Sequence, residues 1–448
     1  MFDLYRSLRD RADPVRVGVI GAGLFGTHLI HQLERVHGLQ TVAIADIEPD
    51  RAERAFTGAG VSTSEITVVS TPMQANTVIN SGGRAVLTDG EDLVETDVVV
   101  VVEATGLPNV GARHAHGAIT AGKHVVMATV ETETVVGPIL AKLADDHGVT
   151  YSMAYGDQPS LIVELHDWAR LAGFDVIAAG KGNSYREAYR YGTPTDIFER
   201  IGIDPGFADT HDLNPRMYNS FYDGTKVAVE MCAVANALEM PPDVPGMHLE
   251  PAEIPEIPEL LRPEADGGIL KNAPAVDTVS SIYPDGTSVD RDISFGVFIV
   301  TKASTKRVRD YLDTFGGTGL YTASAGMYQL FYRPYHLPGI ETGISVASAA
   351  LRNQATGAPQ AHVGEVVAAA KRDLEPGEEL DGGGGTTIYG KLVTAREAAE
   401  AGYVPFELLD EAVVTTAIAQ DEIVTEADVR VNEDAFIYRL RQRQEREL

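Results

Sequence analysis

The chain has 448 residues, of which 44% are hydrophobic, enough for a sizeable core and for roughly two to four domains. Asp and Glu number 65 against 36 Lys and Arg, so the net charge of −29 works against binding to nucleic acids or anionic membranes. No apolar run approaches the roughly 20 residues that a transmembrane helix needs. The single cysteine, Cys232, excludes an internal disulfide and a metal site built from several cysteines.

The acid-rich, lysine-poor composition has two interpretations. It is typical of a cytoplasm with high salt, where screening relieves self-repulsion, and also of an ordinary acidic cytosolic protein. Residues 1–11 alternate charged and apolar side chains and lack the apolar stretch of a signal peptide. We therefore expect a cytoplasmic protein, and whether it is halophilic stays open at this point.

Residues 1–155 alternate strand and helix patterns. The predicted strands are 15–20, 41–45, 98–102, 124–128 and 149–153, and the predicted helices are 27–36, 111–121 and 136–147. Short apolar strands separated by helices are typical of a parallel sheet that is covered on both faces. We predict an α/β chain whose first domain is a doubly wound Rossmann domain.

The amino-acid composition changes after residue 155. Residues 156–338 are richer in Tyr, Pro, Asn and Asp and predict an α+β substrate domain. Residues 339–352 are small and apolar, which predicts a buried helix that completes the first domain. After a polar linker, residues 355–448 predict a separate, mostly β module with a flexible tip at the glycine run 382–385 and a charged terminal helix.

The glycine motif Gly21-Ala-Gly-Leu-Phe-Gly26 directly follows the first predicted strand and opens a helix, which is the context of a dinucleotide fingerprint. Gly21 permits a tight turn, Gly23 lets a diphosphate approach the backbone, and Gly26 lets helix and strand pack closely. The helix N-terminus offers free N–H groups to phosphate. We predict NAD or NADP here, contacted by Gly21, Ala22, Gly23, Leu24, Phe25 and Gly26. The alternative is a structural glycine turn.

Asp46 ends the second predicted strand. An acid at this place binds the ribose hydroxyls and repels a 2′-phosphate, which favours NAD. The alternative is a strand-end Asp that caps the following helix. Arg51 and Arg54 lie nearby and could still admit a 2′-phosphate.

The stretch Glu103-Ala-Thr-Gly-Leu-Pro108 follows a valine-rich strand. Small residues in a turn at the carboxyl end of such a strand border the nicotinamide in doubly wound sheets. Ala104, Thr105 and Gly106 are therefore predicted to line the cofactor, and a tight turn without further function is the alternative.

Several polar side chains follow strands of the sheet or stand in the second domain. Lys181 is flanked by glycines at the end of an apolar strand, where a lysine can polarise or protonate a substrate oxygen. A surface salt bridge is the alternative. Arg333 and His336 could clamp a phosphate or carboxylate, or form a packed corner with Tyr335. The remaining candidates are Glu131, Asp157, Asp223, Lys226 and Glu230.

Taken together, these motifs resemble the 1-deoxy-D-xylulose 5-phosphate reductoisomerase-like family, over nearly the whole chain. Members share a nucleotide-binding domain with homoserine dehydrogenases and end in a SAF domain. The resemblance rests on 21–26, 103–111, 122–131, 156–160, 179–182, 223–237, 246–248, 296–298, 333–337 and 371–378.

The resemblance implies roles for the polar residues. It implies Lys181, Lys226, Arg333 and His336 near the anionic end of a substrate. It implies Glu131, Asp157 and Glu230 in proton transfer or in binding a divalent cation, with Asp223 and Asn236 at the substrate. It further implies NADPH, a SAF domain over 355–448 and a homodimer. The metal ligands themselves stay unassigned.

We therefore predict an NAD(P)-dependent oxidoreductase that acts on a small sugar phosphate, polyol or sugar acid, with Lys181, Glu131, Asp157 and Glu230 as the catalytic candidates. Asp46 favours NAD, whereas the resemblance favours NADP. A homoserine dehydrogenase is one alternative. A nucleotide-sensing or carbohydrate-binding protein without enzymatic activity is another. A small-molecule substrate is expected, and neither nucleic acid nor membrane is expected as a partner.

Overall fold

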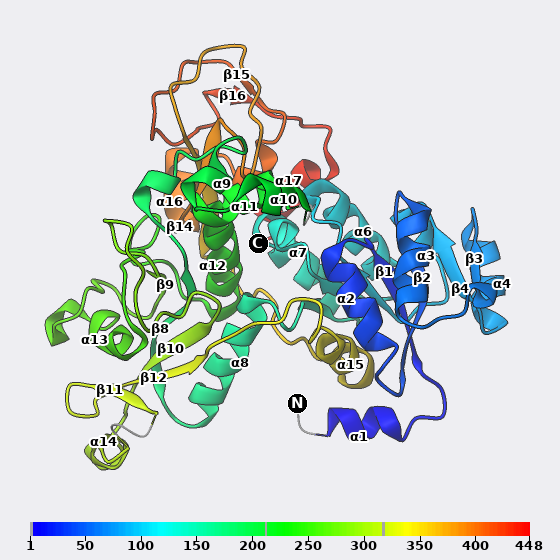
Figure 1. Ribbon diagram of the computed structural model, residues 1–448, viewed down its shortest axis with the longest axis horizontal. Coiled ribbons are helices and arrows are strands. Elements are labelled where there is room, and N and C mark those ends of the chain that lie inside the picture. The colour runs from blue at the N-terminus through cyan, green and yellow to red at the C-terminus, as the bar shows by residue number, and fades with distance from the viewer. Residues whose placement is uncertain (1–2, 211–212, 316–318) are drawn as a thin grey trace. The chain divides into compact units, whose positions relative to one another are not determined.

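The computed structural model describes residues 3–210, 213–315 and 319–448 (Figure 1). By its internal contacts the chain divides into two compact units. Unit 1 comprises Met1–Ser160, Leu337–Pro359 and Asp434–Leu448, and unit 2 comprises Leu161–His336 and Gln360–Glu433. Helix α8 (Gln158–Leu171) begins in the first and continues into the second. These contacts group the chain differently from the predicted limits at 155, 338 and 355.

Unit 1 contains a seven-stranded parallel sheet in the order β3-β4-β2-β1-β5-β6-β7. Its strands are β1 (Val15–Ile20), β2 (Leu39–Ala45), β3 (Ile66–Val68), β4 (Arg84–Leu87), β5 (Val100–Glu103), β6 (His124–Met127) and β7 (Tyr151–Met153). The strand order reverses between β1 and β5, so the carboxyl ends of these two strands border the crevice where doubly wound sheets bind ligands. The predicted Rossmann sheet is confirmed. The sequence patterns missed β3 and β4.

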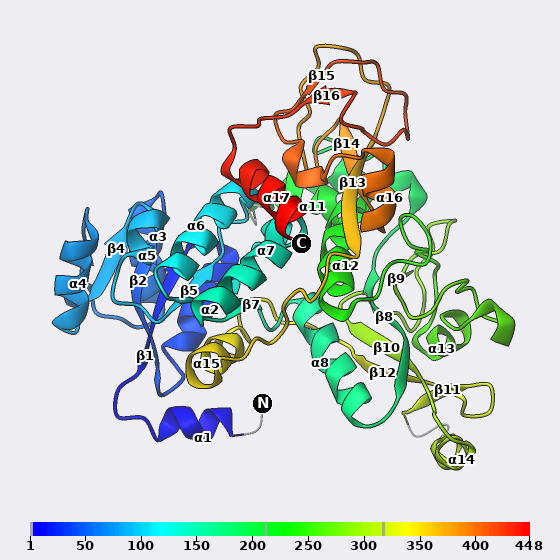
Figure 2. The ribbon, with the colours of Figure 1, turned by 180° about the vertical axis from the view of Figure 1, so that it is seen from behind.

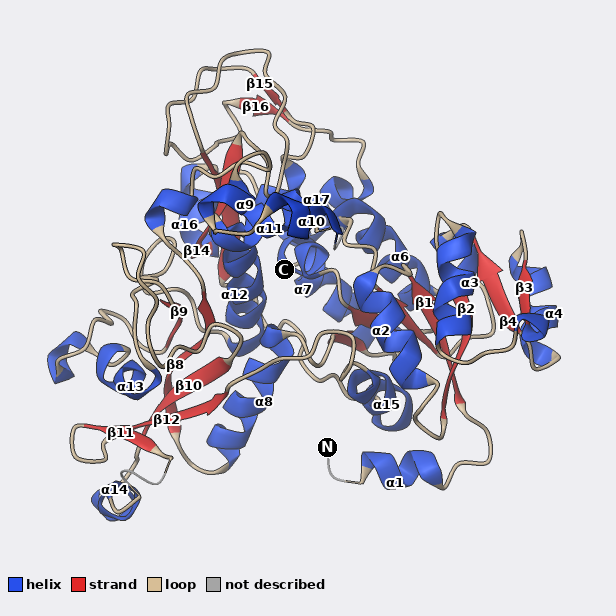
Figure 3. Ribbon diagram, viewed as in Figure 1, coloured by secondary structure: helices blue, strands red, loops and turns tan. Residues whose placement is uncertain are grey.

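One helix of unit 1 precedes β1, and one helix follows each of the strands β1 to β6 (Figure 3). They are α1 (Leu4–Arg9), α2 (Leu24–Leu33), α3 (Pro49–Gly58), α4 (Pro72–Asn80), α5 (Gly90–Val94), α6 (Pro108–Thr120) and α7 (Val130–His147). The three predicted helices start earlier than expected. Helix α6, for example, begins at Pro108, because proline needs no N–H partner at the first helical position.

Two later segments complete unit 1. Helix α15 (Gly343–Arg352) packs against β5, β6 and β7. The terminal helix α17 (Phe436–Glu447) packs along α7 and α6 (Figure 2). Two side chains of α17, those of Arg441 and Gln444, donate to the carbonyl oxygen of Val135, each over 3.2 Å. The last helix of the predicted C-terminal module thus lies in unit 1.

Unit 2 contains a mixed five-stranded sheet in the order β11-β12-β10-β8-β9. The strands are β8 (Asp175–Asn183), β9 (Ala275–Ser280), β10 (Val297–Lys302), β11 (Tyr321–Ala323) and β12 (Tyr328–Arg333). One face packs a core around Phe298 and Tyr328. The smaller helices of the unit are α9 (Ile197–Arg200), α10 (Pro205–Thr210), α11 (Pro215–Tyr222), α13 (Ile257–Leu260), α14 (Lys306–Asp313) and α16 (Ala395–Ala401).

Helix α12 (Thr225–Leu238) is the buried centre of unit 2. It contacts β9 of the mixed sheet and the antiparallel pair β13 (Gly364–Ala370) and β14 (Ile388–Thr394). A second short pair joins β15 (Val413–Val414) to β16 (Val429–Arg430). The glycine run 382–385, predicted as a flexible tip, is instead packed: the Asn219 amide donates to the carbonyl oxygens of Gly384 and Gly385. Over the described ranges, no helix is long and apolar enough to cross a membrane.

Candidate active site

The glycine turn between β1 and α2 has the geometry that the motif predicts. Gly21 has φ +97°, and a Cβ there would lie 2.6 Å from the carbonyl oxygen of Ala104. A Cβ on Gly26 would lie 2.0 Å from the carbonyl oxygen of Gly21. Gly23 differs, because a Cβ on it would meet nothing within 4 Å. The turn is therefore held tightly at both ends and leaves open space over Gly23, at the N-terminus of α2, where a diphosphate fits.

The second predicted turn, Ala104 to Gly106, is organised by Glu103 at the end of β5. The Glu103 side chain is fully buried and accepts from the Thr105 hydroxyl over 2.5 Å and from the Thr129 hydroxyl. The Thr129 hydroxyl oxygen in turn accepts from the backbone N–H of Gly106 over 3.0 Å. Because β5 neighbours β1, this turn lies beside the glycine turn at the reversal of strand order. Sequence reasoning did not select Glu103 as a site residue. A carboxylate directly after five valines was the pattern that could have identified it.

The carboxylate of Asp46 holds backbone at this edge of the sheet. It accepts from the N–H of Ala22 over 2.7 Å and from the N–H of Glu48 over 2.9 Å. Asp46 therefore connects the end of β2 with the glycine turn and with the entry to α3. Arg51 pairs with Glu48 over 2.9 Å, and Leu24 is 74% exposed beside the turn. Asp46 thus holds backbone on both sides, whereas α3 has no side-chain cap at its N-cap residue Glu48, and a role toward ribose stays a prediction.

A buried ion pair lies near the carboxyl end of β8 in unit 2. The Lys181 ammonium donates to the carboxylate of Glu230, which α12 carries, and Lys181 is only 6% exposed. Burial works to raise the pKa of Glu230, but the charges of Lys181 and Lys226 outweigh it and lower that pKa below its ordinary value. Glu230 is therefore ionised and accepts the hydrogen bond of Lys181 as a carboxylate.

Arg333 occupies the same cross-strand row as Lys181. Lys181 on β8 lies opposite Val297 on β10, and Val297 lies opposite Arg333 on β12. Directly opposed residues point to the same face of a sheet, and two strand spacings put the backbones of Lys181 and Arg333 about 10 Å apart. The Arg333 guanidinium also lies 4.5 Å from the ring centroid of Tyr335, so part of the predicted packed corner is present.

His336 completes this group. Its Nδ1 lies 2.8 Å from the carbonyl oxygen of Phe295, so that nitrogen carries the hydrogen and Nε2 is the bare acceptor. Burial lowers the pKa of His336, and the charges of Lys181 and Arg333 act in the same direction, against Glu230. The imidazole is neutral near pH 7 and can take up a proton at Nε2. The structure thus brings Lys181, Lys226, Glu230, Arg333 and His336 together in unit 2. We refer to these five residues as the Lys181 group.

Two other predicted substrate residues serve the packing of unit 2. The Asp223 carboxylate forms a fully buried ion pair with Lys371, 2.8 Å away, and accepts from the N–H of Thr225. The Asn236 amide oxygen accepts from the N–H groups of Val363 and Gly364 over 2.8 and 2.9 Å. These side chains fasten α12 to the strands of the C-terminal segment, and sequence reasoning missed Lys371 as the partner.

Glu131 and Asp157 lie in unit 1. Glu131 is in the first turn of α7, and Asp157 directly precedes α8. Within the described part of the chain, no three His, Cys, Asp or Glu side chains form a group that could hold a metal ion. The Glu230 carboxylate already binds the Lys181 ammonium. A role of the three predicted acids toward a divalent cation therefore stays a prediction, and we derive no step through a metal.

Two family models match consecutive parts of the chain. Residues 15–155 match the family model "Oxidoreductase family, NAD-binding Rossmann fold", and residues 156–342 match "Oxidoreductase DRL, catalytic domain". The chain is thus an oxidoreductase with an NAD-binding Rossmann domain, and its residues 156–342 are similar to the DRL catalytic domain. Its nucleotide-binding domain carries the glycine turn, and its catalytic domain carries the Lys181 group. Neither match extends beyond residue 342, so the SAF domain and the likeness to homoserine dehydrogenases stay predictions.

Solved structures show weaker likeness. The scyllo-inositol dehydrogenase from Lactobacillus casei with bound NAD(H) and scyllo-inositol is 15% identical, with a TM-score of 0.28 over 46% of this chain and 56% of that chain. The 3-ketoreductase KijD10 from Actinomadura kijaniata with NADP is 22% identical, with a TM-score of 0.27 over 38% of this chain and 50% of that chain. The putative oxidoreductase yvaA from Bacillus subtilis is 16% identical, with a TM-score of 0.37 over 77% of this chain and 91% of that chain. The chain spans about half the length of the first two proteins. No curated protein matches it.

Proposed function

We propose that this oxidoreductase interconverts a hydroxyl and a carbonyl group on a small, oxygen-rich substrate with an anionic end, such as a sugar phosphate or sugar acid. The observation that carries the proposal is the buried Lys181–Glu230 ion pair, whose lysine lies in the same cross-strand row as Arg333. A bound nicotinamide nucleotide would accept or supply the hydride. The catalytic roles of Glu131 and Asp157 stay predictions.

The residues of unit 2 supply the proton chemistry in this proposal. The Lys181 ammonium, which Glu230 holds in place, donates a hydrogen bond to the substrate oxygen and stabilises negative charge on it. When a hydroxyl is oxidised, its proton passes to Nε2 of His336, which is neutral and has its tautomer fixed by Phe295. In the reductive direction the same nitrogen returns the proton. His336 thereby takes a proton-transfer role, whereas the sequence suggested only a substrate contact.

Arg333 and Lys226 bind the anionic end of the substrate. A guanidinium forms two parallel hydrogen bonds to a phosphate or carboxylate, which fixes the orientation of the ligand. The row spacing of about 10 Å between the backbones of Lys181 and Arg333 limits the substrate to a few carbon atoms between the reacting oxygen and the anion. This spacing favours a short sugar derivative, and a neutral polyol would leave Arg333 without a ligand charge.

The cofactor preference follows from Asp46. Its carboxylate would repel the 2′-phosphate of NADP, so we propose NAD as the preferred nucleotide. The open space over Gly23 and the tight turn at Gly21 support dinucleotide binding as such. The homodimer and adaptation to high salt stay predictions from the family resemblance and from the net charge of −29.

The test is a substrate panel assayed with NAD and with NADP, at high and at low salt. The panel contains sugar phosphates including deoxyxylulose phosphate, sugar acids, neutral polyols and homoserine. We expect hydride transfer with a phosphorylated or carboxylated sugar and with NAD. Turnover of homoserine alone would replace this proposal by the homoserine dehydrogenase alternative. Nucleotide binding without turnover of any compound would contradict the assigned roles of Lys181 and His336.

A further inference from the structure

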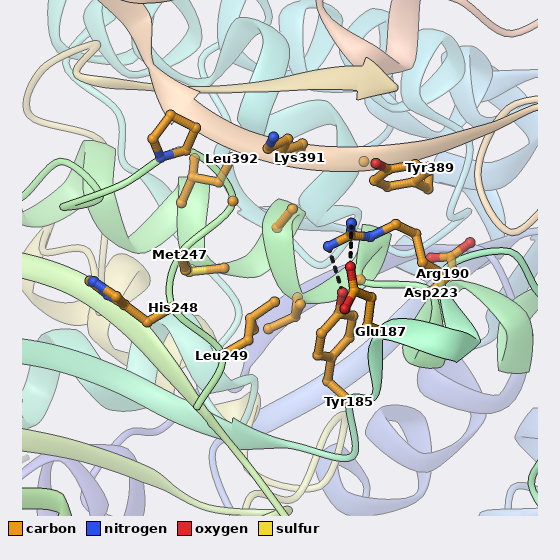
Figure 4. A pocket seen from close by; sticks show the side chains of 16 residues that line it. Tyr185, Glu187, Arg190, Asp223, Met247, His248, Leu249, Tyr389, Lys391 and Leu392 are labelled. Carbon is orange, nitrogen blue, oxygen red and sulfur yellow. Dashed lines mark hydrogen bonds and ion pairs between the residues drawn. The ribbon is translucent and has the colours of Figure 1, made fainter. Parts of the chain in front are cut away.

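A cavity of about 270 Å³ lies within unit 2 (Figure 4). Its walls come from residues 185–190 after β8, the first turns of α12, the loop 245–249 and strand β14. Among the described residues that line it, none is Lys181, Lys226, Glu230, Arg333 or His336. The proposed reaction therefore gives this cavity no task.

Two cations face the cavity. The Arg190 guanidinium donates to the Tyr185 hydroxyl over 2.7 Å and lies 5.1 Å from the ring centroid of Tyr389. Lys391 on β14 lays its aliphatic stem over Gly246. Within the described ranges, its ammonium group has no hydrogen bond and no ion pair. Burial lowers the pKa of Lys391, and the charge of Arg190 lowers it further, while the charges of Glu397 and Asp421 only partly oppose this. An anion between the two side chains would relieve both effects.

The carboxylates of the wall do not balance this charge. Glu187 is 3.8 Å from Arg190, but its side chain is 80% exposed to water, where such a pair contributes little. Asp223 is already paired with Lys371. His248, at another part of the wall, has its own carboxylates, Asp277 at 2.5 Å and Asp243 at 3.5 Å. In a chain of net charge −29, a cavity with two poorly compensated cations is built for an anion.

The loop 245–249 adds an apolar surface in an unusual backbone conformation. Met247 and Leu249 have φ of +65° and +57°, values that side-chain-bearing residues rarely adopt. The loop is held there by hydrogen bonds from the N–H of Gly246 to Leu392 O (2.6 Å) and from the N–H of His248 to Asp277 (3.1 Å). Backbone of this kind persists where surrounding structure enforces it, and it is common at ligand sites. Here it puts two apolar side chains in the cavity wall.

We propose that this cavity is a second ligand site, which binds a small organic oxyanion between Arg190 and Lys391 with its apolar or planar body against Met247 and Leu249. The oxyanion is a phosphate ester or a carboxylate, since both accept hydrogen bonds from a guanidinium and an ammonium group. Tyr185 and Tyr389 border the anion and keep Arg190 in place through the contacts described above.

Calorimetric titration of the full-length chain at constant ionic strength tests the proposal. The probes are phenyl phosphate, benzoate and inorganic phosphate, which separate the two anion types and the need for a ring. We expect saturable binding of phenyl phosphate or benzoate, and weaker binding of inorganic phosphate. Lys391→Met should weaken the better aryl ligand about ten-fold or more, because a charge-assisted hydrogen bond is lost while the stem packing over Gly246 is kept.

Two further variants serve as controls. Lys391→Arg should restore most of the affinity, and Lys306→Met, at an exposed lysine paired with Asp310, should leave it unchanged. If Lys391→Met does not fold, acylation of Lys391 in the native chain is measured by mass spectrometry, and phenyl phosphate or benzoate should slow it. The proposal is overturned if neither aryl anion binds saturably, if Lys391→Met binds with native affinity, or if the acylation rate is unchanged. Equal affinity for inorganic and phenyl phosphate would overturn the assignment of an apolar body.

Discussion

The glycine turn of unit 1 and the Lys181 group of unit 2 are built on different principles. The turn uses backbone: its tight points are a carbonyl oxygen next to Gly21 and another next to Gly26. The Lys181 group uses side chains from strand β8, helix α12, the end of strand β12 and the segment that follows β12, between residues 181 and 336. One site is therefore local in the sequence, and the other exists only after a sheet and a helix have assembled.

This difference determines what a substitution does at each place. In the turn, an added methyl group either collides with backbone or enters open space, so its effect depends on position and not on charge. In the Lys181 group, the charges are buried together, so removing one leaves another without compensation. The predictions below probe this contrast, beginning with the largest expected effect.

Removing the Lys181 ammonium should reduce kcat by roughly 10²–10⁴-fold, the usual contribution of a positioned proton donor, and should leave nucleotide affinity unchanged. Lys181→Met alone would bury the unpaired charge of Glu230, at a cost of about 3–5 kcal/mol in stability. The double variant Lys181→Met/Glu230→Gln removes both charges and separates catalysis from folding. Lys302→Met on β10, at a half-exposed lysine of the same sheet, is the matched control. Native turnover by the folded double variant would refute the assignment.

The two glycine positions should respond differently to the same methyl group. Gly26→Ala puts a Cβ 2.0 Å from a carbonyl oxygen, so we expect lower thermal stability together with loss of nucleotide binding. Gly23→Ala meets nothing within 4 Å, so the fold should be kept while the dissociation constant of NAD rises about ten-fold or more, because the methyl group occupies the space of the diphosphate. Thermal melting and fluorescence titration measure the two quantities. Unchanged NAD affinity in Gly23→Ala would place the diphosphate elsewhere.

The contrast between the two sites also explains what could be predicted from the sequence. The turn at Gly21–Gly26 is encoded by adjacent residues, since strand, glycines and helix follow one another, and its geometry agrees with the prediction. Lys181 could be selected by its flanking glycines, but its partner Glu230 lies on a helix whose packing depends on β9, β13 and β14. No local pattern encodes such a contact.

Two other predicted substrate residues show the same limit. Asp223 and Asn236 are polar residues beside the Lys181 group in sequence, yet Lys371 and the backbone of 363–364 occupy their side chains. These partners are more than a hundred residues away along the chain. Burial of a polar side chain indicates that it has a partner, and only the fold identifies whether that partner is a ligand or another part of the protein.

A buried carboxyl group in unit 1, that of Glu133, should make the stability of the chain depend on pH. Burial raises the pKa of Glu133 on α7 from 4.5 to about 7, although a hydrogen bond from Tyr151 opposes this. The folded chain thus holds a proton that the unfolded chain has lost, and stability should fall as the pH rises from 4.5 to about 7 and then level off. Glu133→Gln should remove this fall and stabilise the chain above pH 7 by on the order of 1–3 kcal/mol. Urea unfolding measures it, with the exposed Glu95→Gln as control. A pH dependence equal to that of the native chain would contradict the assignment.

The smallest effect is expected at Asp46, where backbone support and ligand charge meet in one residue. Two like charges in contact in a water-like medium repel by about 1 kcal/mol, so Asp46→Ser should improve the affinity for NADP relative to NAD about five- to ten-fold. The lost hydrogen bond to the N–H of Ala22 loosens the glycine turn for both nucleotides alike, so the ratio of the two dissociation constants reports the charge alone. Asp50→Asn removes the same charge from the first turn of α3 and should leave that ratio unchanged. A constant ratio in Asp46→Ser as well would mean that the carboxylate serves only to hold the backbone of Ala22 and Glu48, and that Arg51 and Arg54 or the loop itself set the nucleotide preference.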